Sequence, residues 1–204
     1  MSGVWAVVPI KCFADAKSRL RGEISDTGRA ALARRLSSHV LNTVLECGCF
    51  TGVLVLTNDP EIERWSLELG TRVARDDAKK TLAQTIEAGL MRAKEWGGDS
   101  AVVIMGDLPL LSVGVLREFR ELLGDTDCVI GPDRRKVGTN ILGLRRLDVV
   151  PVHFGEPESF RGHLGRMMRE DLRFQIFESV ETGFDVDLPK DYAALISDNV
   201  VTNC

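Results

Sequence analysis

The chain has 204 residues, of which 44% are hydrophobic and 27% charged, and its formal net charge is -4. These values are ordinary for a soluble globular protein, and a chain of this length buries enough surface to fold without a structural metal or disulfides. The slight acidity and the lack of a basic stripe argue against nucleic acid as the main partner. No apolar segment resembles a signal peptide or reaches the ~20 residues that span a membrane, so the sequence predicts a cytoplasmic protein.

Seven apolar segments rich in β-branched residues predict strands. Several of them are apolar throughout, as in strands that are covered on both faces of a sheet. The strands are expected at residues 4–10, 52–57, 71–74, 101–106, 128–131, 140–145 and 174–178.

Between these strands, leucines and alanines recur at helical spacing. Ser25 or Asp26 is expected to cap the first helix, and Asp59 precedes a proline at the first position of the second. Strands that alternate with such helices predict one α/β domain with a mostly parallel sheet, although the less regular order beyond about residue 130 predicts an antiparallel element there. The helices are expected at about 27–45, from Pro60, at 82–96, after Ser112, at 158–169 and at 189–196.

The five cysteines are odd in number and scattered, and they form neither CxxC pairs nor a zinc-binding pattern with histidine. The sequence therefore predicts five reduced thiols, at Cys12, Cys47, Cys49, Cys128 and Cys204.

The stretch VVPIKCFADAKSRL, residues 7–20, places three cations directly after the first strand, namely Lys11, Lys17 and Arg19. Ligands of open parallel sheets bind beyond the carboxyl ends of the strands, so these side chains are candidates for binding a polyphosphate. The alternative is a solvated, charged loop. The loop has neither GxGxxG nor GxxxxGK[ST], which excludes a dinucleotide fingerprint and a Walker loop.

Three carboxylates follow strands or extended segments. Asp107 comes directly after the strand at 101–106, and Asp185 and Asp187 lie two residues apart, on one side of an extended chain. Like charges so placed repel unless a cation lies between them, and oxygen ligands suit Mg²⁺ or Mn²⁺ rather than zinc. The alternatives are that Asp107 caps the following turn and Asp187 the helix near Pro189.

Two further segments combine glycine with small polar residues. GPDRRKVGTN leads to Thr139 and Asn140, and HFGEPES places Gly155 and Ser159 at a helix start. Backbone amides, hydroxyls and an amide side chain suit a small polar ligand, and a helix N-terminus binds anions. The alternatives are a long hairpin turn and an ordinary helix cap.

Five motifs in this order resemble one protein family: VVPIK with AKSRL, MGDLPLL, GPDR with GTN, FG-S-F-H, and DVD before LP. They resemble the guanylyltransferases of coenzyme F-420 (deazaflavin) biosynthesis over nearly the whole chain. The resemblance implies a single-domain, nucleotidyltransferase-like α/β fold (GT-A or Rossmann-like) with three layers. It also implies transfer of GMP from GTP to a phosphorylated three-carbon carboxylic acid, with release of diphosphate.

The resemblance assigns a role to each candidate residue. The resemblance is also compatible with direct transfer of a labile product to the next enzyme of the pathway. Many relatives carry Gly-Leu-Asn near the base pocket, where this chain reads Thr81-Leu82-Ala83. The resemblance places Asp107, Asp185 and Asp187 on Mg²⁺, and it places Lys11, Lys17 and Arg19 on the GTP phosphates with Leu82 near the base. It places Thr139, Asn140, Gly155 and Ser159 at the acid. The catalytic residues that it implies are Lys11, Lys17 and Asp107.

The acid differs between members of the family. Polar groups at Thr139, His153 and Ser159 could satisfy an extra hydroxyl, which favours 3-phospho-D-glycerate over phosphoenolpyruvate and 2-phospho-L-lactate. Two alternative functions are a molybdopterin- or sugar-phosphate-type nucleotidyltransferase, whose first loop is glycine-rich, and a non-catalytic nucleotide-binding module. The three aspartates argue against the second.

Overall fold

The computed structural model describes residues 3–75, 80–147 and 152–197, and the seven predicted strands lie there in one sheet. The strand order is β3-β2-β1-β4-β6-β5-β7. Among these strands β6 alone is antiparallel to its neighbours, which confirms the antiparallel element expected beyond residue 130. The strands are β1 (Gly3–Pro9), β2 (Gly52–Thr57), β3 (Arg72–Arg75), β4 (Gly98–Ile104), β5 (Cys128–Pro132), β6 (Thr139–Leu144) and β7 (Phe174–Ile176).

Six predicted helices are confirmed. The predicted caps Ser25 and Asp59 accept hydrogen bonds from the first-turn amides of their helices, and the structure shows that Ser112 caps α4 in the same way. The sequence did not predict α6, which has four residues, or two short 3-10 turns, at Phe13–Asp15 and Ser18–Leu20. The helices are α1 (Asp26–Cys47), α2 (Pro60–Glu68), α3 (Leu82–Glu95), α4 (Val113–Asp125), α5 (Ser159–Arg169), α6 (Val180–Gly183) and α7 (Pro189–Ser197).

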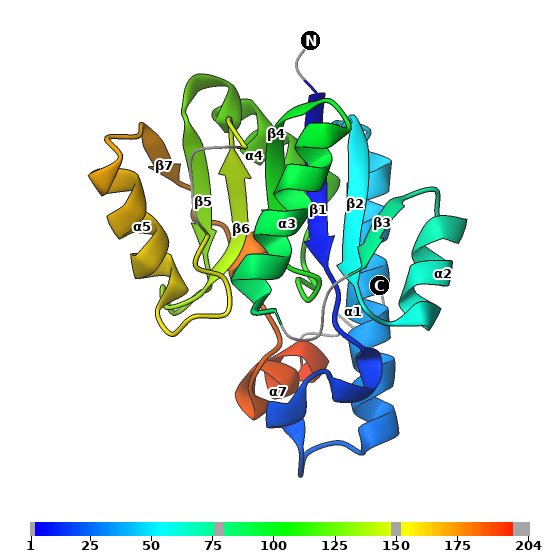
Figure 1. Ribbon diagram of the computed structural model, residues 1–204. Coiled ribbons are helices and arrows are strands. Elements are labelled where there is room, and N and C mark those ends of the chain that lie inside the picture. The colour runs from blue at the N-terminus through cyan, green and yellow to red at the C-terminus, as the bar shows by residue number, and fades with distance from the viewer. Residues whose placement is uncertain (1–2, 76–79, 148–151, 198–204) are drawn as a thin grey trace.

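The sheet is the middle of three layers, with α3 and α5 on the near face in Figure 1 and α1 on the far face. Successive side chains of β1 point to opposite faces of the sheet. Val8 therefore belongs to the apolar cluster that contains residues of α1 and α4, whereas Val7 packs in the cluster with Ile86 and Leu90 of α3. Apolar cores on both faces explain why these strands are apolar throughout. Over the described residues, no helix is both long and apolar enough to cross a membrane.

The reversed direction of β6 matters for the location of the site. Thr139 begins β6 and lies opposite Pro132, the last residue of β5, while Ile104 at the end of β4 pairs with Ile141. The start of β6 thus lies at the same edge of the sheet as the carboxyl ends of β1, β4 and β5. The segments that follow those strands meet Thr139 and Asn140 there.

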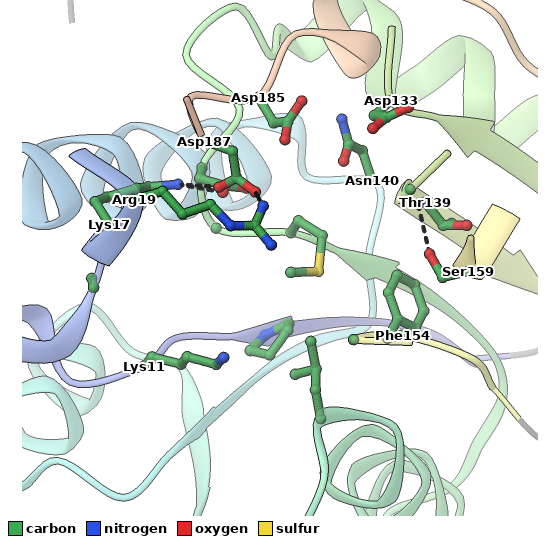
Figure 2. A pocket seen from close by; sticks show the side chains of 18 of the residues that line it. Lys11, Lys17, Arg19, Asp133, Thr139, Asn140, Phe154, Ser159, Asp185 and Asp187 are labelled. Atoms are coloured by element: carbon green, nitrogen blue, oxygen red, sulfur yellow. Dashed lines mark hydrogen bonds and ion pairs between the residues drawn. The ribbon is translucent and has the colours of Figure 1, made fainter. Parts of the chain in front are cut away.

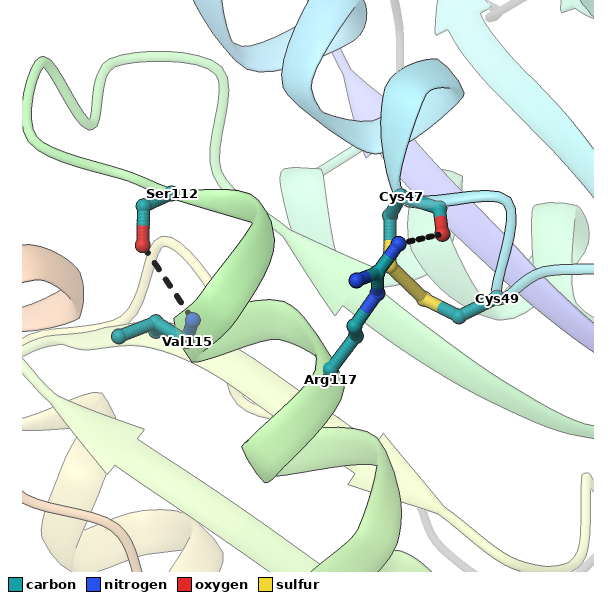
Figure 3. The surroundings of a disulfide bond; sticks show 5 residues. All are labelled: Cys47, Cys49, Ser112, Val115 and Arg117. Carbon is teal, nitrogen blue, oxygen red and sulfur yellow. Dashed lines mark hydrogen bonds between the residues drawn. A yellow bond between two sulfur atoms is a disulfide. The ribbon is translucent and has the colours of Figure 1, made fainter.

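The prediction of five reduced thiols is wrong for one pair, because Cys47 and Cys49 form a disulfide (Figure 3). Gly48, between them, adopts a left-handed conformation (φ 60°) at the end of α1, which turns the chain sharply. The two Cα atoms come to lie 5.2 Å apart, within the range that a disulfide spans. Cys12 and Cys128 are free, and Cys204 lies outside the described residues.

We expect titration of the unfolded, unreduced protein with a thiol reagent to find three thiols, and five after reduction. A Cys47→Ser, Cys49→Ser double variant serves as the control, because it should show three thiols under both conditions. Five reactive thiols in the unreduced wild-type protein would contradict the pairing.

Candidate active site

A pocket of about 760 Å³ opens at the carboxyl edge of the sheet. All eleven residues that the sequence nominated line this pocket, although they come from segments spread over the chain. They are Lys11, Lys17, Arg19, Leu82, Asp107, Thr139, Asn140, Gly155, Ser159, Asp185 and Asp187.

The cations of the first loop meet the carboxylates. Lys17 Nζ lies 2.5 Å from Asp107 Oδ2 and 3.3 Å from Asp187 Oδ1, and Arg19 lies 3.3 Å from Asp187 Oδ2. Figure 2 shows Lys17 and Arg19 directed at Asp187, while Lys11 stands apart from them. Burial by itself would lower the pKa of Lys17, but the charges of Asp107 and Asp187 outweigh it and raise that pKa, so the ammonium is charged at neutral pH.

These contacts bear on the alternatives that the sequence left open. The Lys17 side chain is only 8% exposed, so this part of the loop is not simply solvated. Asp187 does not cap α7 through its side chain in the hydrogen bonds found. Instead the buried Asp191 accepts hydrogen bonds from the backbone N–H groups of Asp187 and Leu188. Arg134 of the β5–β6 turn bonds to the same carboxylate, which ties the Asp187 segment to that turn.

Asp185 is buried close to the other two carboxylates. Its Oδ1 atom has no hydrogen-bond partner, and Arg135 is the cation nearest to it, with its Nη2 3.9 Å from Asp185 Oδ2. Burial, followed by the charges of Asp107 and Asp187, raises the pKa of Asp185 to about 7. The surroundings of Asp185 therefore disfavour its negative charge.

Whether this cluster suits a divalent cation depends on its donor set. Among the described residues, no three His, Cys, Asp or Glu side chains are grouped closely enough to hold a metal as they lie, and Lys17 Nζ occupies the space between Asp107 and Asp187. The chemistry nevertheless fits. The donors are hard carboxylate oxygens, one of them is buried without a partner, and Asp185 is held in a site that disfavours its negative charge.

Thr139, Ser159 and Asn140 form the opposite wall of the pocket. The Thr139 N–H donates to Ser159 Oγ at 3.1 Å, as Figure 2 shows. Thr139 Oγ1 lies 3.0 Å from Nδ1 of the buried His163. Asn140 Nδ2 donates to the carbonyls of Thr182 and Gly183 in α6, which anchors this wall to the segment before Asp185. These hydrogen bonds hold Thr139, Ser159 and Asn140 in place in the wall of the pocket.

Gly155 joins this wall to α3. Its φ of +81° lies in the region that favours glycine, and a Cβ atom there would come within 3.1 Å of the Leu82 Cβ. The loop that carries Phe154 and Gly155 is therefore packed directly on the first residue of α3.

We expect Gly155→Ala to lower the free energy of unfolding by about 1–2 kcal/mol, because alanine resists this φ and would push Leu82 away. Urea unfolding measures this effect. Gly124→Ala in α4 is the matched control: its Cβ would meet nothing within 4 Å and its φ is not positive, so stability should stay equal or rise. Equal stability of Gly155→Ala and wild type would contradict the packing argument.

Two further candidates gain a role from the structure, Arg135, which the sequence analysis did not nominate, and His163, the histidine of the FG-S-F-H motif. Arg135 lines the pocket and makes ion pairs of 3.6–3.9 Å with three carboxylates, too long for strong hydrogen bonds, so its guanidinium can contact a ligand. The arginine pair was visible in the sequence, but which arginine faces the pocket depends on the turn geometry, since Asp133 accepts the N–H groups of Arg135 and Val137. The second candidate is His163, which contacts Thr139 from behind.

The fold is that of nucleotidyltransferase-like proteins. A nucleotidyl transferase from Methanothermobacter thermautotroptrophicus superposes with a TM-score of 0.70 over 100% of both chains at 18% identity. A CMP:2-keto-3-deoxy-manno-octonic acid synthetase complexed with CTP superposes with a TM-score of 0.64 at 16% identity, over 97% of this chain and 100% of that one. At such identities the likeness concerns the fold alone, and the fold predicted from the sequence is confirmed.

The sequence comparisons narrow the class. A family model described as "Guanylyl transferase CofC like" matches residues 4–200. A phosphoenolpyruvate guanylyltransferase from Rubrobacter xylanophilus is 35% identical over 94% of this chain and 93% of that protein. A 2-phospho-L-lactate guanylyltransferase from Methanocaldococcus sp. (strain FS406-22) is 26% identical over 91% of this chain and 78% of that protein. This chain belongs to the CofC-like guanylyl transferase family.

Proposed function

We propose that this guanylyltransferase moves GMP from GTP to the phosphate of a three-carbon carboxylic acid, releasing diphosphate, in coenzyme F-420 biosynthesis. Membership of the family supports the reaction class. The observation that carries the proposal is one pocket in which Lys17 and Arg19 meet Asp107 and Asp187, with two hydroxyl groups on the facing wall. Such a pocket holds cations for phosphates and neutral donors for a second anion.

The chemistry that this pocket must perform is dominated by charge. GTP carries about four negative charges, and the acid that attacks its α-phosphorus is itself an anion, so neutralisation and in-line positioning supply most of the rate. The acid's phosphate oxygen is already a nucleophile near neutral pH, and no general base is required. Lys11, Lys17 and Arg19 are proposed to bind the GTP phosphates and to stabilise the departing diphosphate.

We propose that Asp107, Asp185 and Asp187 hold Mg²⁺, or Mn²⁺ in its place. When bound, the ion supplies positive charge that polarises phosphate oxygens and offsets charge in the transition state. The three carboxylates would hold the ion, and in this structure the ammonium of Lys17 contacts two of them, Asp107 and Asp187.

For the acid we propose phosphoenolpyruvate first, because relatives that cover most of this chain, up to 35% identical, carry that name. The sequence favoured 3-phospho-D-glycerate because polar groups at Thr139, His153 and Ser159 could bind its extra hydroxyl. In the structure, however, His153 is not among the residues that line the pocket, and the Thr139 hydroxyl oxygen bonds to His163. What remains on Thr139 and Ser159 is hydrogen-bond donors, which suit the anionic oxygens common to all three acids.

The test is diphosphate release from the purified protein with GTP and Mg²⁺. Phosphoenolpyruvate, 3-phospho-D-glycerate and 2-phospho-L-lactate are offered in parallel, and ATP replaces GTP in a matched series. We expect release with phosphoenolpyruvate that falls sharply with ATP. A clear preference for 3-phospho-D-glycerate would support the substrate that the sequence favoured. If no diphosphate is released with any of the three acids, the protein uses a different acceptor or is a non-catalytic module.

A further inference from the structure

The buried His163 ring connects the acid side of the pocket with the body of α5. The residue is 0% exposed, its Nε2 lies 2.9 Å from the backbone N of His153, and its Nδ1 lies 3.0 Å from Thr139 Oγ1. Both ring nitrogens are therefore engaged, one by the main chain and one by a residue that lines the pocket.

The backbone contact fixes where the ring proton lies. A backbone N–H can only donate, so Nε2 must be the bare, accepting nitrogen. A neutral imidazole then carries its proton on Nδ1. With the proton on Nε2 instead, two N–H groups would point at each other inside a buried site.

The surroundings keep the ring neutral. Burial first, and then the nearby His153, lower the pKa of His163 to about 3, and a hydrogen bond to the backbone of Ser159 acts in the opposite direction. The ring packs edge-to-face against Phe154 and His153, and Glu156, 2.8 Å from His153 Nδ1, is the acidic group nearest this cluster among the contacts found. None of these neighbours offers His163 a carboxylate that would stabilise its charged form.

The proton on Nδ1 determines what Thr139 can do. Nδ1–H can donate to Thr139 Oγ1 and to the Ser159 backbone, and a protonated Nδ1 cannot accept, so the threonine cannot give its own hydroxyl proton to the ring. No other acceptor for that proton is found among the described residues, and Thr139 lines the pocket. Ser159 Oγ is in the same position, because it accepts the Thr139 N–H and keeps its own proton.

We propose that His163 is a positioning residue: it holds Thr139 as an obligatory hydrogen-bond donor to an anionic oxygen of the acid substrate. The inference rests on the proposed function. A freely rotating hydroxyl could equally turn a lone pair towards the anion, which would repel it. His163 prevents that orientation of the Thr139 hydroxyl. The hydroxyl groups of Thr139 and Ser159 therefore both act as neutral donors towards the pocket.

The first test needs no substrate, so its failure is separable from failure of the proposed function. Protein labelled with ¹⁵N in the rings of His39, His153 and His163 is titrated by NMR from pH 8 to pH 5. We expect His163 to show a protonated Nδ1 and a bare Nε2, unchanged across this range. A protonated Nε2, or a second proton gained near pH 6.5, would overturn the proposal.

The second test is a double-mutant cycle with Thr139→Val and His163→Phe. We expect His163→Phe to raise the KM for the acid about tenfold while changing the KM for GTP less than about twofold. Combined with Thr139→Val, it should add nothing. A rise in both KM values, or an effect that adds to that of Thr139→Val, would show a merely structural role.

Isosteric variants give an independent check. The amide nitrogen of His163→Asn can stand where Nδ1–H stands, whereas the amide of His163→Gln reaches the Nε2 side. We expect His163→Asn to recover part of the acid KM and His163→Gln to behave like His163→Phe. Equal behaviour of the Asn and Gln variants would contradict the proposal.

Discussion

Asp107→Asn is expected to lower kcat by about three orders of magnitude and to leave the fold intact. Asp107 is the carboxylate closest to Lys17, with 2.5 Å between Oδ2 and Nζ, and the proposed reaction needs it for the cation. Asparagine keeps the shape and removes the charge. Lys17 is only 8% exposed but retains Asp187, and Asp107 itself is 21% exposed, so the free energy of unfolding should fall by about 1–2 kcal/mol, too little to unfold the protein.

The measurement is a steady-state assay together with urea unfolding of the same sample. Glu61→Gln provides a matched control, because it also removes a carboxylate that pairs with an arginine, Arg34, but on the surface and away from the pocket. That control should keep kcat unchanged. Near-normal turnover by Asp107→Asn would remove Asp107 from the proposed cation site.

Asp185→Asn is expected to abolish turnover and yet to stabilise the metal-free protein at pH 8, by about 1–2 kcal/mol. The side chain is buried beside two carboxylates, and its Oδ1 has no partner. A neutral amide removes the repulsion, although it still leaves a buried polar group and loses the long ion pair with Arg135.

The pH dependence of this effect has a definite sign. The Asp185 carboxyl titrates near 3.8 in the unfolded chain and near 7 in the folded protein. Between these values the folded protein keeps a proton that the unfolded chain has released, so this residue costs more stability as pH rises from about 4 to about 7. The advantage of Asp185→Asn should therefore be absent near pH 4 and complete at pH 8.

Thermal unfolding at both pH values, with and without Mg²⁺, measures this effect. We expect Mg²⁺ to raise the Tm of the wild type at pH 8 and to raise that of Asp185→Asn much less, because a bound ligand stabilises only the state that binds it. If Asp185→Asn is less stable than wild type at pH 8 without metal, the prediction is wrong. Repulsion between Asp185 and the other two carboxylates would then be too weak to destabilise the wild type.

The sheet could be predicted from the sequence because each strand has a recognisable apolar pattern of its own. GVLVLT and AVVIMG are apolar on both faces, and this pattern depends on no other part of the chain. Asp59-Pro60 and Ser112 similarly mark helix starts by local chemistry. Helix α6 also has a serine cap, Ser179, but with only four residues it has no helical repeat of apolar residues that the sequence could show, and it forms where Asn140 bonds to its carbonyls.

The site was predictable as a set of residues but not as a set of contacts. Lys17, Asp107 and Asp187 could be nominated one by one, because each follows a strand or an extended segment. Their mutual distances depend on how the segments after β1, β4 and α6 pack together. The role of His163 needed two contacts, with residues 10 and 24 positions away in the chain, and no local pattern shows either.

The disulfide was missed for a different reason. The cysteine count is odd and the spacing is C-x-C, so the usual patterns gave no signal. What pairs Cys47 with Cys49 is the left-handed turn at Gly48, and a glycine between two cysteines at a helix end is the feature that could have indicated it.

The most direct test of the central claim is to identify the products by ³¹P NMR after incubation of the protein with GTP, phosphoenolpyruvate and Mg²⁺. We expect free diphosphate and, in equal amount, a new diphosphate-linked product that joins GMP to the acid. We also expect that neither signal appears with Asp107→Asn. Formation of GDP and inorganic phosphate, or unchanged GTP with every acid tried, would contradict the proposed reaction.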